Sequence, residues 1–132
     1  MKKDLVTYLS VTQILAIHDL MVKNFGGSFG IRDLGLVESA VARPKASFDG
    51  QDLYLDVFSK AAALLQSLLK NHPFIDGNKR TAFTSAAIFL KLNGWKLVNK
   101  HQKSVEFAIS VDNSHLSVEQ IFEWLKNNSS KL

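Results

Sequence analysis

Two neighbouring stretches decide the fold: Asp56-Val-Phe-Ser-Lys-Ala-Ala-Ala-Leu-Leu-Gln-Ser-Leu-Leu-Lys-Asn-His72 and Asn78-Lys-Arg-Thr-Ala-Phe-Thr-Ser-Ala-Ala-Ile-Phe-Leu-Lys91. In the first, apolar residues recur every three or four positions, the spacing of one helix face, and Asp56 can cap the helix. The second carries no charge over residues 81–90, which predicts a helix buried on all sides. Pro73 disfavours a helical residue before it, so we expect two separate core helices joined by a loop.

Shorter amphipathic segments flank this pair. Capping boxes at Ser10-Val-Thr-Gln13 and Ser117-Val-Glu-Gln120 predict helices to about residue 23 and over 117–127. Two more helices are expected at about 33–41 and 102–111, and Phe48-Asp-Gly50 is a turn signal. No pair of β-runs suffices for a larger sheet. The sequence therefore predicts an all-α, compact helical bundle with at most one small β-hairpin, near 45–55.

Length and composition narrow the class of protein. A chain of 132 residues with 46% hydrophobic residues suits one domain, 1–132, with a real core. The absence of cysteine excludes disulfides, thiol catalysis and cysteine-ligated zinc. We identify no signal peptide and no membrane span, so we expect a cytoplasmic protein. The net charge of +4 is compatible with phosphate, acidic protein or nucleic acid, and does not choose among them.

The loop His72-Pro-Phe-Ile-Asp-Gly-Asn-Lys-Arg80 differs in composition from both flanking helices. The helix that follows points its N-terminal N–H groups into the loop, which is a natural anion site. Gly77 allows close approach to the backbone, and Asn78 can add an amide donor. Lys79 and Arg80 lie in the first turn, where cations are unfavourable, and a bound polyphosphate would compensate for them.

The remaining loop residues supply the other parts of a phosphate-transfer site. Asp76 is a hard oxygen ligand of the kind that holds Mg²⁺ together with substrate phosphates. His72 can accept a proton from an attacking hydroxyl. Phe74 is interpreted as a hydrophobic anchor that holds the loop against the core. A zinc site at His72 and Asp76 is disfavoured, because Pro73 interrupts the helix and no third ligand follows.

The same nine residues resemble the signature of the Fic/Doc (Fido) superfamily, His-x-Phe-x-(Asp/Glu)-Gly-Asn-x-Arg. The rest of the chain is similar to its death-on-curing (Doc) branch, the toxins of toxin–antitoxin pairs. The similar features are Ile17-His18, Phe25-Gly-Gly, Gly30-Ile-Arg-Asp33, Leu36-Val-Glu-Ser-Ala40, Arg43-Pro44, Lys60-Ala-Ala-Ala63, Asn93-Gly94 and Trp124-Leu125. The resemblance covers essentially the whole chain.

The resemblance implies roles for the loop. His72 would be the general base, Asp76 would hold Mg²⁺, and Gly77, Asn78 and the nearby backbone would form an anion hole with Arg80 on phosphate. Targets would dock beside a small flap, placed at about 45–55. Adenylylating Fic enzymes typically have glycine at the position of Lys79 and a second arginine at Phe83. Both departures favour a Doc-type kinase that passes the γ-phosphate of ATP to a hydroxyl of elongation factor Tu.

Several alternatives stay open at this stage. One is a Fic-type protein adenylyltransferase, and another is a catalytically idle module that regulates an antitoxin. No inhibitory Ser/Thr-x-x-x-Glu-Gly/Asn motif is present, so a separate antitoxin with a disordered segment is the expected partner. DNA would be reached only through that antitoxin, because no helix has a DNA-reading pattern. His18, His101 and His115 have no evident partners and are interpreted as core or surface residues, and Arg32 and Asp33 as a structural pair.

Overall fold

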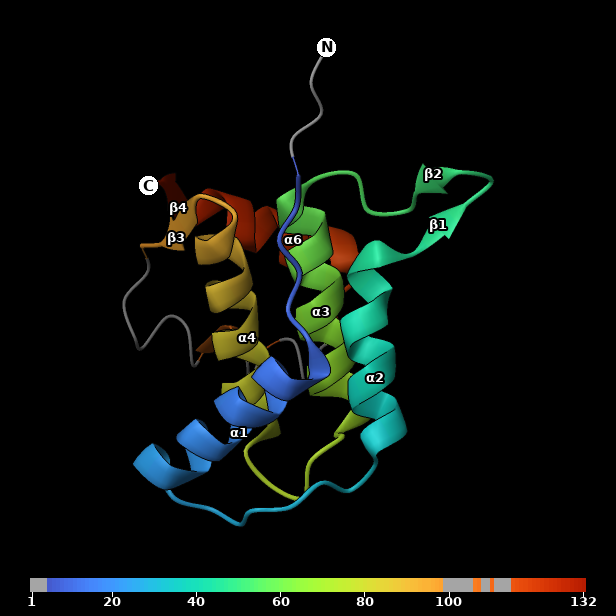
Figure 1. Ribbon diagram of the computed structural model, residues 1–132. Helices are drawn as coiled ribbons and strands as arrows, with labels where there is room; N and C mark the ends of the chain where they lie inside the picture. Colours follow the sequence, from blue (N-terminus) through green and yellow to red (C-terminus); the bar gives the residue numbers. More distant parts are fainter. Residues whose placement is uncertain (1–4, 99–105, 108–109, 111–114) are drawn as a thin grey trace.

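The computed structural model describes residues 5–98, 106–107, 110 and 115–132. Its described α-helices are α1 Val11–Phe25, α2 Leu34–Ala42, α3 Val57–Asn71, α4 Asn78–Leu92 and α6 Val118–Asn127, with a 3-10 turn η1 at Arg43–Lys45. Helix α3 lies at the centre and contacts α2, α4 and α6, while α1 lies against α4 (Figure 1). This confirms the all-α bundle. The helix expected over 102–111 lies mostly outside the described residues.

Side-chain caps explain where most of these helices begin. Ser10 and Ser117 each accept the N–H of the third helical residue, and Gln13 and Gln120 complete the two predicted capping boxes. Asp56 caps α3 in the same way. These caps satisfy backbone N–H groups that have no partner within the helix. The helix starts expected from local sequence are therefore confirmed.

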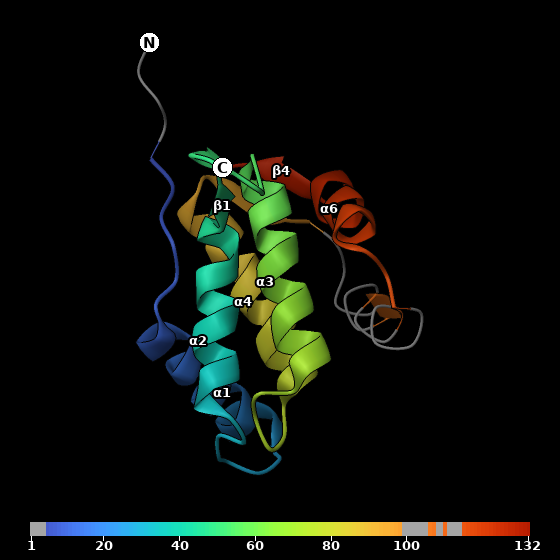
Figure 2. The same cartoon turned by 90° about the vertical axis from the view of Figure 1, so that its right-hand side faces the viewer.

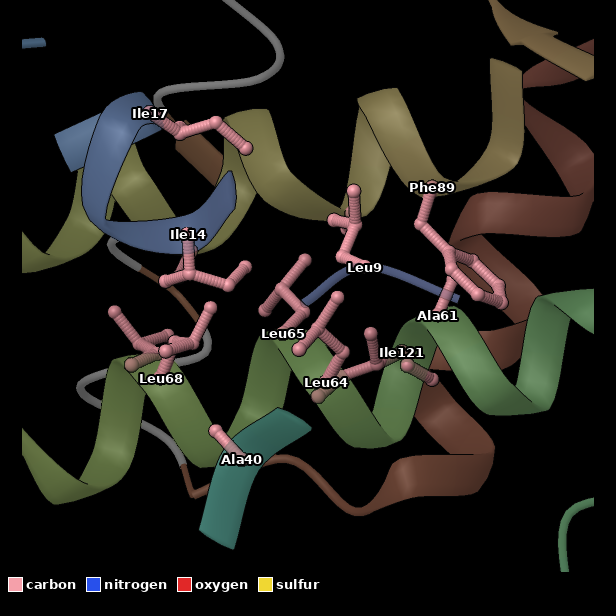
Figure 3. Packing of buried hydrophobic residues seen from close by; sticks show 14 of the residues in the cluster. Leu9, Ile14, Ile17, Ala40, Ala61, Leu64, Leu65, Leu68, Phe89 and Ile121 are labelled. Carbon is pink, nitrogen blue, oxygen red and sulfur yellow. The ribbon is translucent and has the colours of Figure 1, made fainter. Parts of the chain in front are cut away.

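The core is built around the inward face of α3 (Figure 3). Residues from every described helix meet there, and each is at most 7% exposed: Ile14, Ile17, Ala40, Ala61, Leu64, Leu65, Leu68, Phe89 and Ile121. Residues 81–90 of α4 include no exposed position, as the uncharged run predicts. Among the described residues, no helix combines the length and the apolar character that crossing a membrane requires.

Two short antiparallel strand pairs accompany the helices. Strand β1 Ser47–Phe48 pairs with β2 Gln51–Asp52, which confirms the predicted hairpin. Strand β3 Trp95–Leu97 pairs with β4 Ser129–Lys131, a pair that the sequence expectation of at most one hairpin missed. Each of these strands has three residues, and 31 residues separate them along the chain. No local sequence pattern therefore predicts that they pair.

Two cations attach the hairpin to α3. The side chain of Lys60 is 1% exposed, and its Nζ donates to the Pro44 carbonyl at 3.2 Å and to Asp52 Oδ2 at 3.1 Å. The Arg43 guanidinium donates to the hydroxyl oxygens of Tyr54 and Ser67. Both sides of the hairpin base are therefore fixed on the same helix.

Candidate active site

The loop singled out by the sequence connects the C-terminus of α3 to the N-terminus of α4. Both views show it at one end of the bundle, together with the connection between α1 and α2 (Figures 1 and 2). That connection pairs with the loop through backbone bonds. Arg32 N and Asp33 N both donate to the Pro73 carbonyl, and Ile75 N donates to the Gly30 carbonyl at 3.2 Å. The site therefore consists of two chain segments rather than one.

His72 is the residue at which α3 ends. It takes the left-handed helical conformation, with φ 48° and ψ 60°, and this conformation ends the right-handed helix. Non-glycine residues adopt this region rarely, although histidine does so more often than most. Its side chain is exposed and has no hydrogen bond among the described residues. The imidazole is thus available to a substrate.

Arg32 holds the backbone on which His72 is carried. Its Nε donates to the His72 carbonyl and its Nη2 to the Asn71 carbonyl, both at 2.6 Å. These carbonyls belong to the last turn of α3 and have no partner within the helix. The expected pairing of Arg32 with Asp33 is wrong. Arg32 caps α3 instead, and the Asp33 carboxylate caps α2 by accepting from Leu36 N.

The Asp76 carboxylate is exposed and held by backbone N–H groups. Oδ1 accepts from Gly77 N at 2.8 Å, and Oδ2 accepts from Ser28 N at 3.1 Å. A carboxylate has about four lone-pair sites, so about two stay open for a cation. Gly27 lies close by: a Cβ at that position would be 2.8 Å from Oδ2. The carboxylate therefore has a defined position and room for a ligand on its outer side.

The donor set suits Mg²⁺ with a bound polyphosphate better than a metal held by protein alone. In the part of the chain that the structure describes, no cluster of three or more His, Cys, Asp or Glu side chains could hold a metal ion. Mg²⁺ is commonly bound by one or two carboxylates, substrate phosphates and water. Asp76, with open lone pairs beside a helix N-terminus, fits that requirement.

Asn78 has a definite structural position. Its side chain is buried, with Oδ1 accepting from Phe74 N at 3.0 Å and Nδ2 donating to the Phe74 carbonyl at 2.9 Å. One amide thus bonds both backbone groups of Phe74 and closes the loop across four residues. The predicted contact between Asn78 and phosphate remains a prediction, and the bonds in place make Asn78 a clamp.

The N-terminus of α4 lacks the side-chain cap that the other described helices have. Gly77 precedes it with φ +75°, and it provides no side-chain cap hydrogen bond. Lys79 and Arg80 are both exposed. The Arg80 guanidinium lies over the Phe25 ring at 4.2 Å from the centroid, a cation–π contact that fixes where the charge sits. A helix dipole and two cations therefore lie next to the Asp76 carboxylate.

His18 is the site residue that sequence reasoning missed. It is 2% exposed in α1, its ring stacks on Phe74 with centroids 3.8 Å apart, and its Nε2 lies 2.7 Å from the Asp76 carbonyl oxygen. Phe74 itself is 1% exposed. A lone polar residue on the apolar face of the first helix was the available signal. Such a residue must find a partner when it is buried.

The hairpin β1–β2 does not flank this loop. Figures 1 and 2 both place it at the opposite end of α3. With 15 residues, α3 spans about 22 Å at a rise of about 1.5 Å per residue. The expectation of a target-binding flap at 45–55 therefore does not agree with the position of the loop, and the place where targets dock stays a prediction. The segment beside the loop is residues 26–33.

Comparison with known proteins gives further evidence about the family of this chain. A family model described as "Fic/DOC family" matches residues 8–90, a range that contains every residue of the site. The protein named toxin Doc of Mycolicibacterium smegmatis is 55% identical over 73 residues, which cover 55% of this chain and 56% of that protein. The protein named protein kinase doc of Escherichia phage P1 is 28% identical over 119 residues, 90% of this chain and 93% of that protein.

Proposed function

Since this chain belongs to the Fic/DOC family, we propose that it is a Doc-type toxin with protein kinase activity. It transfers the γ-phosphate of Mg²⁺-bound ATP to a hydroxyl of elongation factor Tu and so blocks translation. The observation that carries the proposal is the arrangement of His72, Asp76 and the uncapped α4 N-terminus around one loop. The phage P1 relative, named as a protein kinase, supports the choice of reaction.

His72 is the proposed general base. As the target hydroxyl oxygen bonds to the γ-phosphorus, the bond between that phosphorus and the β–γ bridging oxygen breaks. ADP leaves, and the hydroxyl proton passes to the imidazole. An exposed imidazole without a competing hydrogen bond suits this role, and general-base catalysis contributes about 10²–10⁴-fold to a rate. Arg32 contributes by fixing the His72 backbone.

The phosphate-binding part of the site has three components. Gly77, Asn78 and the neighbouring backbone form the proposed anion hole, and Lys79 and Arg80 neutralise phosphate charge. Asp76 would hold Mg²⁺, which when bound neutralises charge on the phosphate oxygens. A catalyst of this kind works mainly by positioning and by electrostatics, which is what the loop residues provide.

The position of Phe83 favours phosphate transfer over adenylylation. It is half-buried, and its ring meets that of Trp124 edge-on with centroids 5.5 Å apart. Its side chain packs between α4 and α6. The second arginine that is typical of adenylylating Fic enzymes has no counterpart at this position.

The target would meet the apolar side chains exposed around the loop. Phe29, Ile31 and Ile75 are 59%, 43% and 61% exposed, and all belong to the two segments that form the site. Clustered exposed apolar residues commonly mark an interaction surface. We also propose a separate antitoxin with a disordered segment as the inhibitor, DNA contact only through that antitoxin, and action in the bacterial cytoplasm.

The test is a labelling assay with purified elongation factor Tu, Mg²⁺ and ATP labelled at either the γ- or the α-phosphate. We expect transfer of the γ-label only, lowered about 10²–10⁴-fold by His72→Ala. The matched control is His115→Ala, because His115 is also exposed and also has a positive φ, 54° against 48°. That control should retain the activity.

Other results would contradict the proposal in distinct ways. Transfer of the α-label would indicate adenylylation and overturn the argument from Lys79 and Phe83. Folded protein without transfer of either label would favour an idle antitoxin-binding module. Equal loss of activity in His72→Ala and His115→Ala would mean that the loop histidine has no special role.

A further inference from the structure

The buried imidazole of His18 contacts the loop at Phe74 and at Asp76, and it lies close to Gly77. It stacks on the Phe74 ring with an interplanar angle of 6° and approaches the Asp76 carbonyl oxygen to 2.7 Å. Its Nε2 and Cδ2 also lie 3.7 Å from where a Cβ on Gly77 would stand. The contact with Asp76 spans 58 residues of sequence, and it reaches the backbone of the proposed metal ligand from its inner side.

The chemistry of the contact fixes the proton on the ring. A carbonyl oxygen can only accept a hydrogen bond, so Nε2 must be the donor. Nδ1 lies 3.9 Å from the carboxylate of Asp19, which is 72% exposed. That separation is too long for a hydrogen bond. A hydrogen on Nε2 therefore satisfies the contact with Asp76.

The contact determines which way the next peptide N–H points. The peptide between Asp76 and Gly77 is trans, so its carbonyl and its N–H point in opposite directions. Holding the carbonyl toward α1 turns the Gly77 N–H away from the core. There it donates to Asp76 Oδ1 at 2.8 Å. The imidazole on the inside thus sets the direction of the carboxylate on the outside.

We propose that His18 is a positioning residue of the active site, acting through the Asp76–Gly77 peptide to aim the carboxylate that would hold Mg²⁺. The inference rests on the proposed function for the role of that cation. It differs from simple core packing, because it assigns the effect to the Nε2–H donor and not to the ring. Partners of this kind behind a metal ligand commonly contribute 10–100-fold to metal affinity or activity.

Two substitutions separate the donor from the ring. His18→Phe keeps a flat ring that can stack on Phe74 and removes the N–H. His18→Gln keeps an amide donor at similar reach and removes the ring. The control is Leu125→Ala, a fully buried position in α6 that lowers stability without touching the loop. All variants are assayed well below their unfolding temperatures.

The first measurement is calorimetric titration with Mg²⁺ and a non-hydrolysable ATP analogue. We expect His18→Phe to weaken binding about 10–100-fold, while His18→Gln and Leu125→Ala stay close to the original chain. The second is the NMR amide shift of Gly77 without ligand, which should move in His18→Phe and be largely restored in His18→Gln.

The second measurement needs no nucleotide, so it decides the inference even if the unaltered chain binds none and the proposed function fails. An unchanged Gly77 amide in His18→Phe would overturn the inference. Equal effects of the Phe and Gln substitutions would also overturn it, because the ring and not the donor would then be responsible.

Discussion

Replacing Gly27 by alanine should damage the active site more than it damages the fold. Its φ is +111°, and an added Cβ would lie 2.8 Å from Asp76 Oδ2. Ordinary contact begins at 3.4 Å, so the carboxylate must move by about 0.6 Å (3.4 − 2.8). A misplacement of about 1 Å can cost about 10²-fold in rate. By the same scale we expect kcat/KM to fall roughly 10-fold.

Gly26 provides the matched control. Its φ is +87°, and an added Cβ would meet nothing within 4 Å. Both alanines therefore cost about 1–3 kcal/mol of backbone strain, and both should lower Tm by several degrees. Only Gly27→Ala pushes on the carboxylate. Phosphate transfer and thermal unfolding of the two variants, measured side by side, test this. Equal activity in the two would refute the claim that the Asp76 position limits catalysis.

Two further predictions concern stability, each measured by urea unfolding. Asn78→Ala leaves the buried N–H and C=O of Phe74 without partners, at about 1–3 kcal/mol per group, so we expect a loss of about 2–6 kcal/mol; a loss below about 1 kcal/mol would mean that other bonds close the loop. Asp52→Ala leaves the buried Lys60 ammonium without its carboxylate and should cost about 1–3 kcal/mol, reduced because Asp52 is 38% exposed. Lys60→Met should leave the free energy of unfolding almost unchanged. A larger loss in Lys60→Met than in Asp52→Ala would contradict this account of the pair.

The sequence predicts the helices well because their signals are local. The apolar spacing in α3 and the caps at Ser10, Asp56 and Ser117 each lie within one or two turns of the structure they predict. The hairpin was also predictable, since Asp49 and Gly50 have the positive φ values that its tight turn requires. The loop is likewise distinct in the sequence, because its composition breaks the pattern of both flanking helices.

The features that were missed depend on distant partners. Strands β3 and β4 have three residues each, and they pair although they are far apart in the sequence. Arg32 donates to the His72 carbonyl, 40 residues away in the sequence. The adjacent Asp33 instead favoured the prediction of a local ion pair. Only tertiary packing decides these two relations. The misplaced flap is a different case, because the predicted helix that ends at His72 already separates residues 45–55 from the loop.

Because the loop depends on hydrogen bonds to residues outside it, the nine-residue signature cannot maintain its structure alone. Its backbone is held by Arg32 on the Pro73 side, and its middle is held by His18 and Ser28. Grafted between two helices of another protein, the nine residues would keep the Asn78 clamp and the bond from Gly77 N to Asp76 Oδ1, and they would lose the bonds from α1 and from residues 26–33. A transplant that preserves the site must also carry α1 and the segment 26–33.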